Sequence, residues 1–172
     1  LERKVSIVTP KPQTTRHRIL GILSRPGWQI AIVDTPGLHD GHRRMLNQYM
    51  NRSASASLED ADVVVFVVEA LRWTDEDDRV LQRIRRADRP AVLVINKVDR
   101  ARPRSRLLPF VDELAKRHPF VAVVPLSATK RDNLGRLPEV IAAQLPESPP
   151  LFPPEQYTDR SERFRTAEII RE

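Results

Sequence analysis

The sequence predicts an α/β fold, a three-layer sandwich in which helices cover both faces of a mixed, mostly parallel sheet. Short apolar runs rich in β-branched residues are continuous rather than alternating, which is typical of strands buried on both faces. These runs occupy 30–33, 63–68, 91–95 and 121–124. Segments with apolar residues at three- and four-residue steps separate most of them, and strands that alternate with helices predict right-handed crossover connections.

The first element is expected to be an antiparallel hairpin at one edge of the sheet. Residues 18–23 and 28–33 flank Ser24-Arg25-Pro26-Gly27. Proline followed by glycine at the centre of a four-residue bend favours a tight turn.

Four amphipathic helices are expected after the hairpin, giving the order ββαβαβαβα. Their apolar stripes run over 46–61, 81–88, 107–118 and 134–145, the second being weak. Thr74 precedes three carboxylates, a pattern that predicts a helix N-terminus with a capping hydroxyl and acids beside the positive dipole end.

Composition excludes several classes of site. The 172 residues include no cysteine, which rules out disulfides and thiolate zinc sites, and the four histidines show no metal-ligand spacing. No apolar run approaches the length of a membrane helix. The net charge of +6 permits an anionic partner such as RNA or a membrane surface.

The C-terminal part has a different character. Five prolines lie within 146–156 and indicate a stiff linker over 146–157, after which 158–172 begins a new helical segment. Since fifteen residues cannot form a core, we expect a second domain to start there. The chain begins without methionine and ends within this helical pattern, so we expect a fragment of a longer protein.

Polar clusters follow three of the predicted strands, where α/β sheets bind ligands. They are Asp34-Thr35-Pro36-Gly37, Asn96-Lys97-Val98-Asp99 and Ser127-Ala128-Thr129.

The second cluster has the chemistry of a guanine reader. The Asp99 carboxylate offers two acceptor oxygens to the N1–H and N2 amine of guanine, whereas adenine has no such pair of donors. Lys97 can lay its aliphatic stem along the base, Asn96 can tie neighbouring loops together, and Ser127-Ala128 can present an N–H to the guanine O6. The alternative is that Asn96 caps the next helix and Asp99 is an ordinary loop carboxylate.

The first cluster fits a γ-phosphate and metal sensor. Asp34 can hold Mg²⁺ through a water, and Gly37 lets its backbone N–H approach a phosphate. Upstream, the hydroxyl of Thr14 or Thr15 is a candidate Mg²⁺ ligand. An ordinary Asp-x-Pro-Gly turn, and a threonine that starts an edge strand, are the alternatives.

Taken together, these motifs resemble the Era family of bacterial GTPases. The resemblance rests on 12–19, 34–39, 68–74, 96–99 and 158–164, in family order. It implies a Ras-like P-loop NTPase domain over 1–145 and the start of a KH domain at 158–172. It also assigns switch I to 13–17, the start of switch II to 34–38 (Asp34, Thr35, Pro36, Gly37 and Leu38), the base reader to 96–99 and the last guanine loop to 127–129.

The resemblance further implies GTP/GDP and Mg²⁺ as cofactors and GTP hydrolysis as the activity. Its implied partners are small-subunit rRNA near the 3′ end and the 30S subunit, for a cytoplasmic monomer with peripheral association to the inner membrane. The alternative from another class is a non-hydrolysing ribosome-docking module with a degenerate GTPase fold.

Two departures from the family pattern affect these expectations. The five glycines form neither a Gly-x-x-x-x-Gly-Lys-Ser/Thr phosphate loop nor a Gly-x-x-Gly RNA clamp, so we expect residues 1–172 alone to hold GTP poorly and to be inactive. Leu38 stands where Ras-type enzymes place a water-orienting glutamine, which predicts slow turnover. Arginine clusters at 83–89 and 100–106 fit a solvated surface better than an rRNA-facing patch.

Overall fold

The computed structural model describes residues 19–34, 58 and 60–159. The chain divides into two compact units. One unit contains the described residues 19–34 and 147–159, and the other runs from Leu58 to Pro146.

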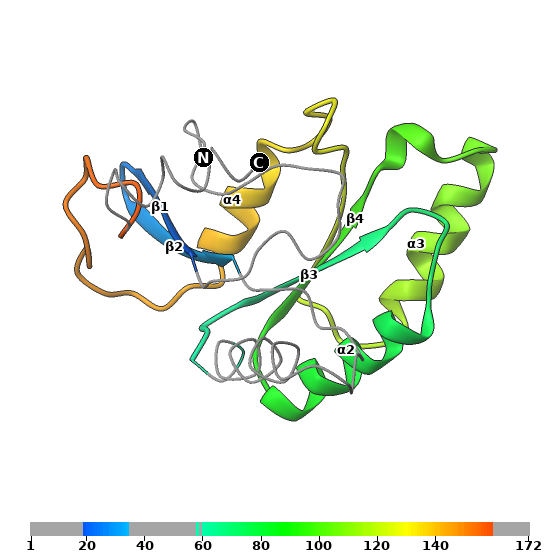
Figure 1. The fold of residues 1–172 in the computed structure, drawn as a ribbon, viewed down its shortest axis with the longest axis horizontal. Helices are drawn as coiled ribbons and strands as arrows, with labels where there is room; N and C mark the ends of the chain where they lie inside the picture. The colour runs from blue at the N-terminus through cyan, green and yellow to red at the C-terminus, as the bar shows by residue number, and fades with distance from the viewer. Residues whose placement is uncertain (1–18, 35–57, 59, 160–172) are drawn as a thin grey trace, which may run out of the picture. The chain divides into compact units, whose positions relative to one another are not determined.

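The larger unit is built on a parallel sheet (Figure 1). Its strands lie in the order β3 (Val64–Glu69), β4 (Ala91–Asn96) and β5 (Ala122–Pro125). The connections contain α2 (Asp75–Ala87), the 3₁₀ turns η1 (Val98–Arg100) and η2 (Arg104–Arg106), and α3 (Leu107–Ala115), while α4 (Arg136–Ala142) follows β5.

Helices pack on both faces of this sheet, which confirms the predicted three layers. Leu93 and Ile95 of β4 pack with Ile84 of α2 and Leu114 of α3. On the other face, Val92, Val94, Val124 and Leu126 form a second cluster, against which Leu134, Leu137 and Val140 pack. β4 is therefore the buried centre of the unit.

The prediction that β3 is buried on both faces was wrong for one face. Val64, Phe66 and Val68 are buried, but Val65 and Val67 are 37% and 53% exposed. β3 is an edge strand of the described three-stranded sheet, and the second cluster gathers over β4 and β5. An apolar run therefore does not by itself establish that both faces are covered.

The helix starting after Thr74 forms as predicted. The Thr74 hydroxyl accepts a hydrogen bond from the Asp77 backbone N–H, and the Asp77 carboxylate accepts one from the Thr74 N–H at 2.8 Å. This capping box satisfies two N–H groups at the helix start. α3 and α4 are shorter than their stripes. The helix predicted over 46–61 lies mainly outside the described residues; of the three residues described in that range, 58, 60 and 61, Leu58 is helical.

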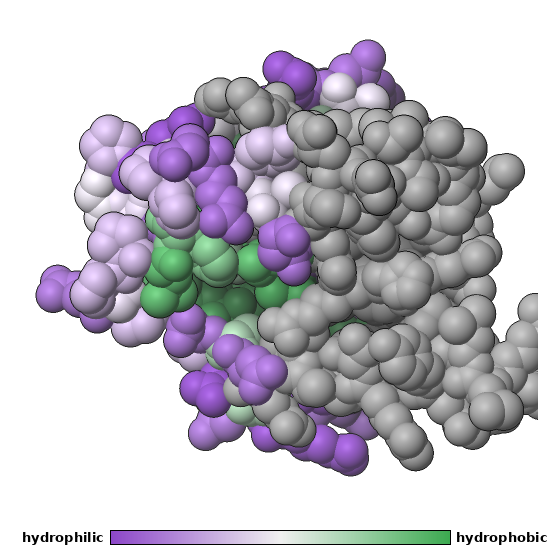
Figure 2. Space-filling view, turned by 60° about the vertical axis from the view of Figure 1, so that its left-hand side comes forward, coloured by the Kyte–Doolittle hydropathy of each residue, from purple (hydrophilic) through white to green (hydrophobic). Residues whose placement is uncertain are grey.

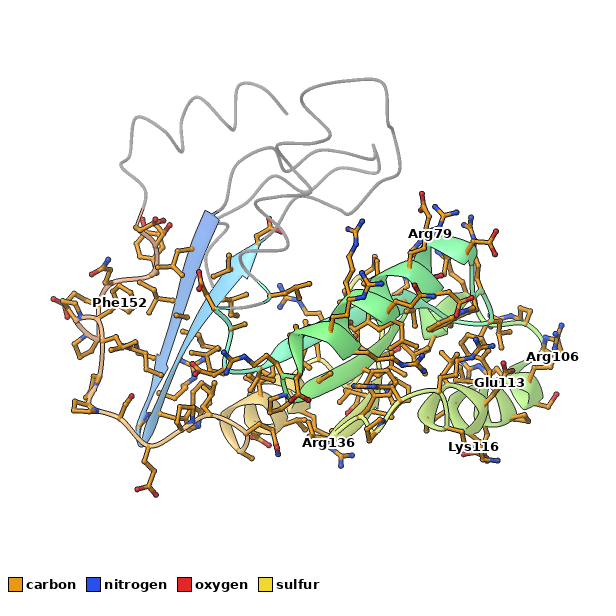
Figure 3. The ribbon with its side chains drawn as sticks, turned by 90° about the horizontal axis from the view of Figure 1, so that it is seen from below. Arg79, Arg106, Glu113, Lys116, Arg136 and Phe152 are labelled. Atoms are coloured by element: carbon orange, nitrogen blue, oxygen red, sulfur yellow. The ribbon has the colours of Figure 1, made fainter. Side chains whose placement is uncertain are left out.

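Arg117 joins α2 to α3. Its guanidinium lies 4.6 Å from the centre of the Trp73 ring and pairs with Glu113 of α3 at 2.7 Å and Asp78 of α2 at 3.4 Å. Arg85 of α2 donates to the Arg117 carbonyl. Figure 3 shows Glu113 on its helix. Arg85, a member of the first arginine cluster, thus contributes to the packing between these helices.

In the smaller unit, β1 (Ile19–Arg25) and β2 (Trp28–Asp34) form the predicted antiparallel hairpin. Pro26 and Gly27 make the turn, and Gly27 has φ +88°, a conformation that side chains with a Cβ rarely adopt.

The proline-rich segment of the same unit is fastened to this hairpin. The Gln29 Oε1 accepts from the N–H groups of Leu151 and Phe152 at 3.0 Å, and its Nε2 donates to the Phe152 carbonyl at 2.9 Å. The Ile22 N–H donates to the Tyr157 carbonyl, and the Thr158 hydroxyl donates to the Leu20 carbonyl. The predicted linker is therefore held along β1 and β2 over 151–158.

Within the described ranges, no helix has the length and apolar character needed to cross a membrane. In the view of Figure 2, hydrophilic residues cover much of the described surface around an area where hydrophobic residues gather.

Candidate guanine-nucleotide site

The carboxyl ends of the three parallel strands bring two of the predicted clusters together. Glu69 at the end of β3 lies opposite Asn96 at the end of β4. The Leu126 N–H donates to the Ile95 carbonyl at 2.9 Å, and the Val98 N–H donates to the Leu126 carbonyl at 3.3 Å. The loops after β4 and β5 are therefore joined by their backbones.

Asn96 links these two loops through its side chain. Its Oδ1 accepts from the Lys97 N–H at 2.7 Å and from the Ala128 N–H at 3.1 Å. The N-cap of η1 is Lys97, and no side chain caps that turn. The alternative in which Asn96 caps the following helix is therefore wrong.

Lys97 adopts the left-handed conformation, with φ 63° and ψ 31°. A residue with a Cβ pays about 1–3 kcal/mol to be held in such a region, so the surrounding contacts must offset this cost. The Lys97 backbone N–H donates a hydrogen bond to Asn96 Oδ1, and the Lys97 ammonium Nζ lies 2.9 Å from Glu69 Oε2. That hydrogen bond is the main cause of the lowered pKa of Glu69.

Asp99 is held by Ser127 from the neighbouring loop. The Ser127 hydroxyl is fully buried and donates to Asp99 Oδ1 at 2.6 Å, while it accepts from the Lys130 N–H at 3.1 Å. The hydroxyl bond is the leading cause of the lowered pKa of Asp99. Asp99 is therefore ionised at neutral pH, as an acceptor for two guanine donors must be.

The remaining predicted residues of these clusters have distinct positions. Val98 packs against the hydrophobic core and acts as a spacer between Lys97 and Asp99. Thr129 is exposed beyond Ala128. Because the Ala128 N–H already donates to Asn96, donation to a guanine O6 would require that this N–H be shared or redirected.

The predicted phosphate and metal residues are only partly covered by the structure. Thr14, Thr15, Thr35, Pro36, Gly37 and Leu38 lie outside the described residues. Asp34 ends β2, in the smaller unit. Over 19–34, 58 and 60–159 there is no group of three or more histidine and carboxylate side chains that could hold a metal ion, so the magnesium assignments stay predictions.

Sequence reasoning assigned no role to Glu69. The available signal was an acid placed directly after a buried strand run, at the same sheet edge as the base reader. Its partner could not be predicted, because Lys97 lies 28 residues away along the chain.

Comparisons with known proteins agree with this geometry. The family model described as 50S ribosome-binding GTPase matches residues 1–97. GTPase Era from Marinobacter nauticus is 48% identical over all 172 residues, which make up 56% of that relative. GTPase Era from Ectopseudomonas mendocina is 49% identical, and this chain covers 58% of it. The chain thus spans little more than half the length of these curated relatives.

Solved structures give the same result. A crystal structure of Era in complex with MgGDPNP and nucleotides 1506–1542 of 16S ribosomal RNA matches with a TM-score of 0.93 and 41% identity. The match covers 99% of this chain and 58% of that one. A variant of Aquifex aeolicus Era bound to GDP and AlF₄⁻ matches equally well. The predicted Ras-like fold and the resemblance to Era are confirmed, and the protein belongs to the family described as 50S ribosome-binding GTPase.

Proposed function

We propose that a protein carrying this chain binds and hydrolyses GTP with Mg²⁺ and acts in the assembly of the small ribosomal subunit. One observation carries the nucleotide part of this proposal. Ser127 holds the Asp99 carboxylate ionised and oriented, at the sheet edge where Asn96 and Lys97 also lie.

This arrangement selects guanine by hydrogen-bond pairing. A carboxylate has about four acceptor positions, and Ser127 uses one of those on Asp99. The others suit the N1–H and N2 amine of guanine, whereas adenine would leave the carboxylate unpaired. Such a mismatch can cost about 10⁴-fold in discrimination.

The decisive test is the substitution Asp99→Asn. An amide replaces one acceptor oxygen with a donor that opposes the guanine amine and suits the carbonyl of xanthine. We expect the preference for GDP over XDP to fall by about 100-fold or more. Titration of both nucleotides, followed by ¹⁵N NMR of the loop amides, measures this ratio even at millimolar affinity.

Asp88→Asn is the matched control, because Asp88 is an exposed residue at the C-cap of α2, where asparagine tolerates the left-handed conformation. It should leave the GDP/XDP ratio unchanged. Unchanged GDP affinity in Asp99→Asn would remove Asp99 from the site.

For hydrolysis, we propose that Asp34 and Thr14 or Thr15 hold Mg²⁺, and that Gly37 and Leu38 form the switch beside the γ-phosphate. An apolar Leu38 cannot orient a water, so intrinsic turnover should be slow. Leu38→Gln should not raise the rate of single-turnover hydrolysis greatly. A thousand-fold gain would show that a glutamine at this position can orient the attacking water, as in Ras-type enzymes.

The second arginine cluster is the surface that we propose for rRNA. Arg104 and Arg106 are exposed and form no ion pair within the described residues, and Arg106 points away from the start of α3 in Figure 3. Arg102 instead donates to backbone carbonyls. Cations without acidic partners are available to phosphates.

A 3′-terminal oligonucleotide of 16S rRNA tests this surface against a 23S rRNA fragment of equal length. Arg104→Ala with Arg106→Ala should reduce the slope of log K against log salt by about 1.4. Arg86→Ala with Lys116→Ala, a pair of exposed cations elsewhere, should change RNA affinity less. Preference for the 23S fragment would point to the large subunit named in the family description and against the 16S partner.

We further propose that this protein is a cytoplasmic monomer that associates with the 30S subunit and peripherally with the inner membrane. Co-sedimentation with 30S subunits and, separately, with anionic lipid vesicles tests these partners.

A further inference from the structure

Glu69 is an acid carried by the sheet itself rather than by a loop. It is the last residue of β3 and lies opposite Asn96, directly beside the start of the base-reading loop. Its Oε2 accepts from Lys97 Nζ at 2.9 Å. Arg72 also lies near this oxygen, but at 3.7 Å and with a side chain that is 68% exposed.

The close ion pair restrains a side chain that would otherwise be mobile. A lysine side chain loses rotamer freedom when it is fixed, and a left-handed backbone adds strain. Anchoring Nζ to the end of β3 makes the Lys97 stem span from its loop to the neighbouring strand. The loss of side-chain freedom and the backbone strain at Lys97 therefore arise on folding and not on nucleotide binding.

We infer that Glu69 is a positioning residue for nucleotide binding, which holds the aliphatic stem of Lys97 as a preformed wall for the purine ring. This inference rests on the proposed function of the site. The lowered pKa of Glu69 agrees with it, since the ionised form is the one that pairs. An apolar stem contacts any purine face, so Glu69 should affect affinity and leave base selectivity to Asp99.

The test compares GDP with IDP, which lacks the N2 amine. Glu69→Gln should lower the affinities for GDP and IDP by the same factor, about three- to five-fold, as expected for a partly exposed ion pair. Removing a negative charge would on its own favour an anionic nucleotide, so a loss cannot be a charge effect. Arg72→Gln is the control and should change either affinity by less than about 1.5-fold.

A double-mutant cycle with Lys97→Met separates positioning from a merely structural role. Methionine keeps an apolar stem but lacks the ammonium, so adding Glu69→Gln in this background should have no further effect on affinity. The Lys97 ¹⁵Nζ signal should broaden in Glu69→Gln because solvent exchange is faster, and Glu69→Asp should restore part of the affinity.

Three results would overturn the inference: unchanged or tighter binding in Glu69→Gln, a loss confined to one of the two bases, or an equal loss in the Lys97→Met background. If the unmodified protein shows no preference for GDP over ADP, the proposed function itself fails. That outcome is distinguishable, because it does not depend on any substitution at Glu69.

Discussion

Gln29 and Asp99 show two different uses of a polar side chain. Gln29 uses both amide protons and both lone pairs within the protein, on Ser24, Leu151 and Phe152. Asp99 accepts one side-chain hydrogen bond, from Ser127, and keeps acceptor capacity at the sheet edge. A saturated polar group builds the fold, whereas an oriented but unsaturated one is suited to binding a ligand.

The largest effect in this comparison is expected at Gln29. Gln29→Leu removes the partners of the Leu151 and Phe152 backbone groups, so the free energy of unfolding of the hairpin unit should fall by about 2 kcal/mol. Hydrogen exchange at the Leu151 and Phe152 amides should accelerate accordingly. GDP affinity should stay unchanged, and Gln29→Glu, which keeps the acceptor, should lose about half as much stability.

An intermediate effect is expected at Ser127, which serves both fold and site. Ser127→Ala leaves the Lys130 N–H without its acceptor and releases Asp99, so stability should fall by about 1–2 kcal/mol. GDP should bind several-fold more weakly in the same variant. Thermal unfolding and nucleotide titration together check this, and a loss of stability alone would show that Asp99 needs no orientation.

The smallest effect concerns pH. The Ser127 hydroxyl is the main cause of the lowered pKa of Asp99 in the folded protein. The ionised Asp99 carboxylate therefore stabilises the fold at pH values above the ordinary carboxyl pKa, and this stabilisation is lost as the pH falls through the folded pKa. GDP affinity should therefore not respond to Asp99 between about pH 8 and pH 6. The ¹³C shift of the Asp99 carboxyl should titrate at higher pH in Ser127→Ala than in the unmodified protein.

Local sequence signals predicted most of the fold. The continuous run at 91–95 predicted β4 because that strand is buried on both faces, and Thr74 with its following acids predicted the start of α2 because a capping box is a short-range feature. The exposed face of β3 could not be predicted, since covering a strand depends on distant elements.

The candidate site shows the same limit. That Asn96 and Asp99 lie beside Ser127 and Ala128 was predictable, because both clusters follow neighbouring strands of one parallel sheet, while their role as a base reader stays a prediction. The Lys97–Glu69 pair joins residues 28 apart, and the Gln29–Phe152 contact joins residues 123 apart. Such pairs depend on how strands and loops meet in three dimensions, and no local pattern records them.

The hydrogen bonds between residues 151–158 and the hairpin also restrict the conformations of this segment. A flexible linker of about a dozen residues has an end-to-end distance near 20 Å and absorbs small displacements of either end. Here Tyr157 and Thr158 are bonded directly to β1, so they follow this strand as a rigid extension. A displacement of β1 would therefore be passed on to Tyr157 and Thr158 rather than absorbed by the segment.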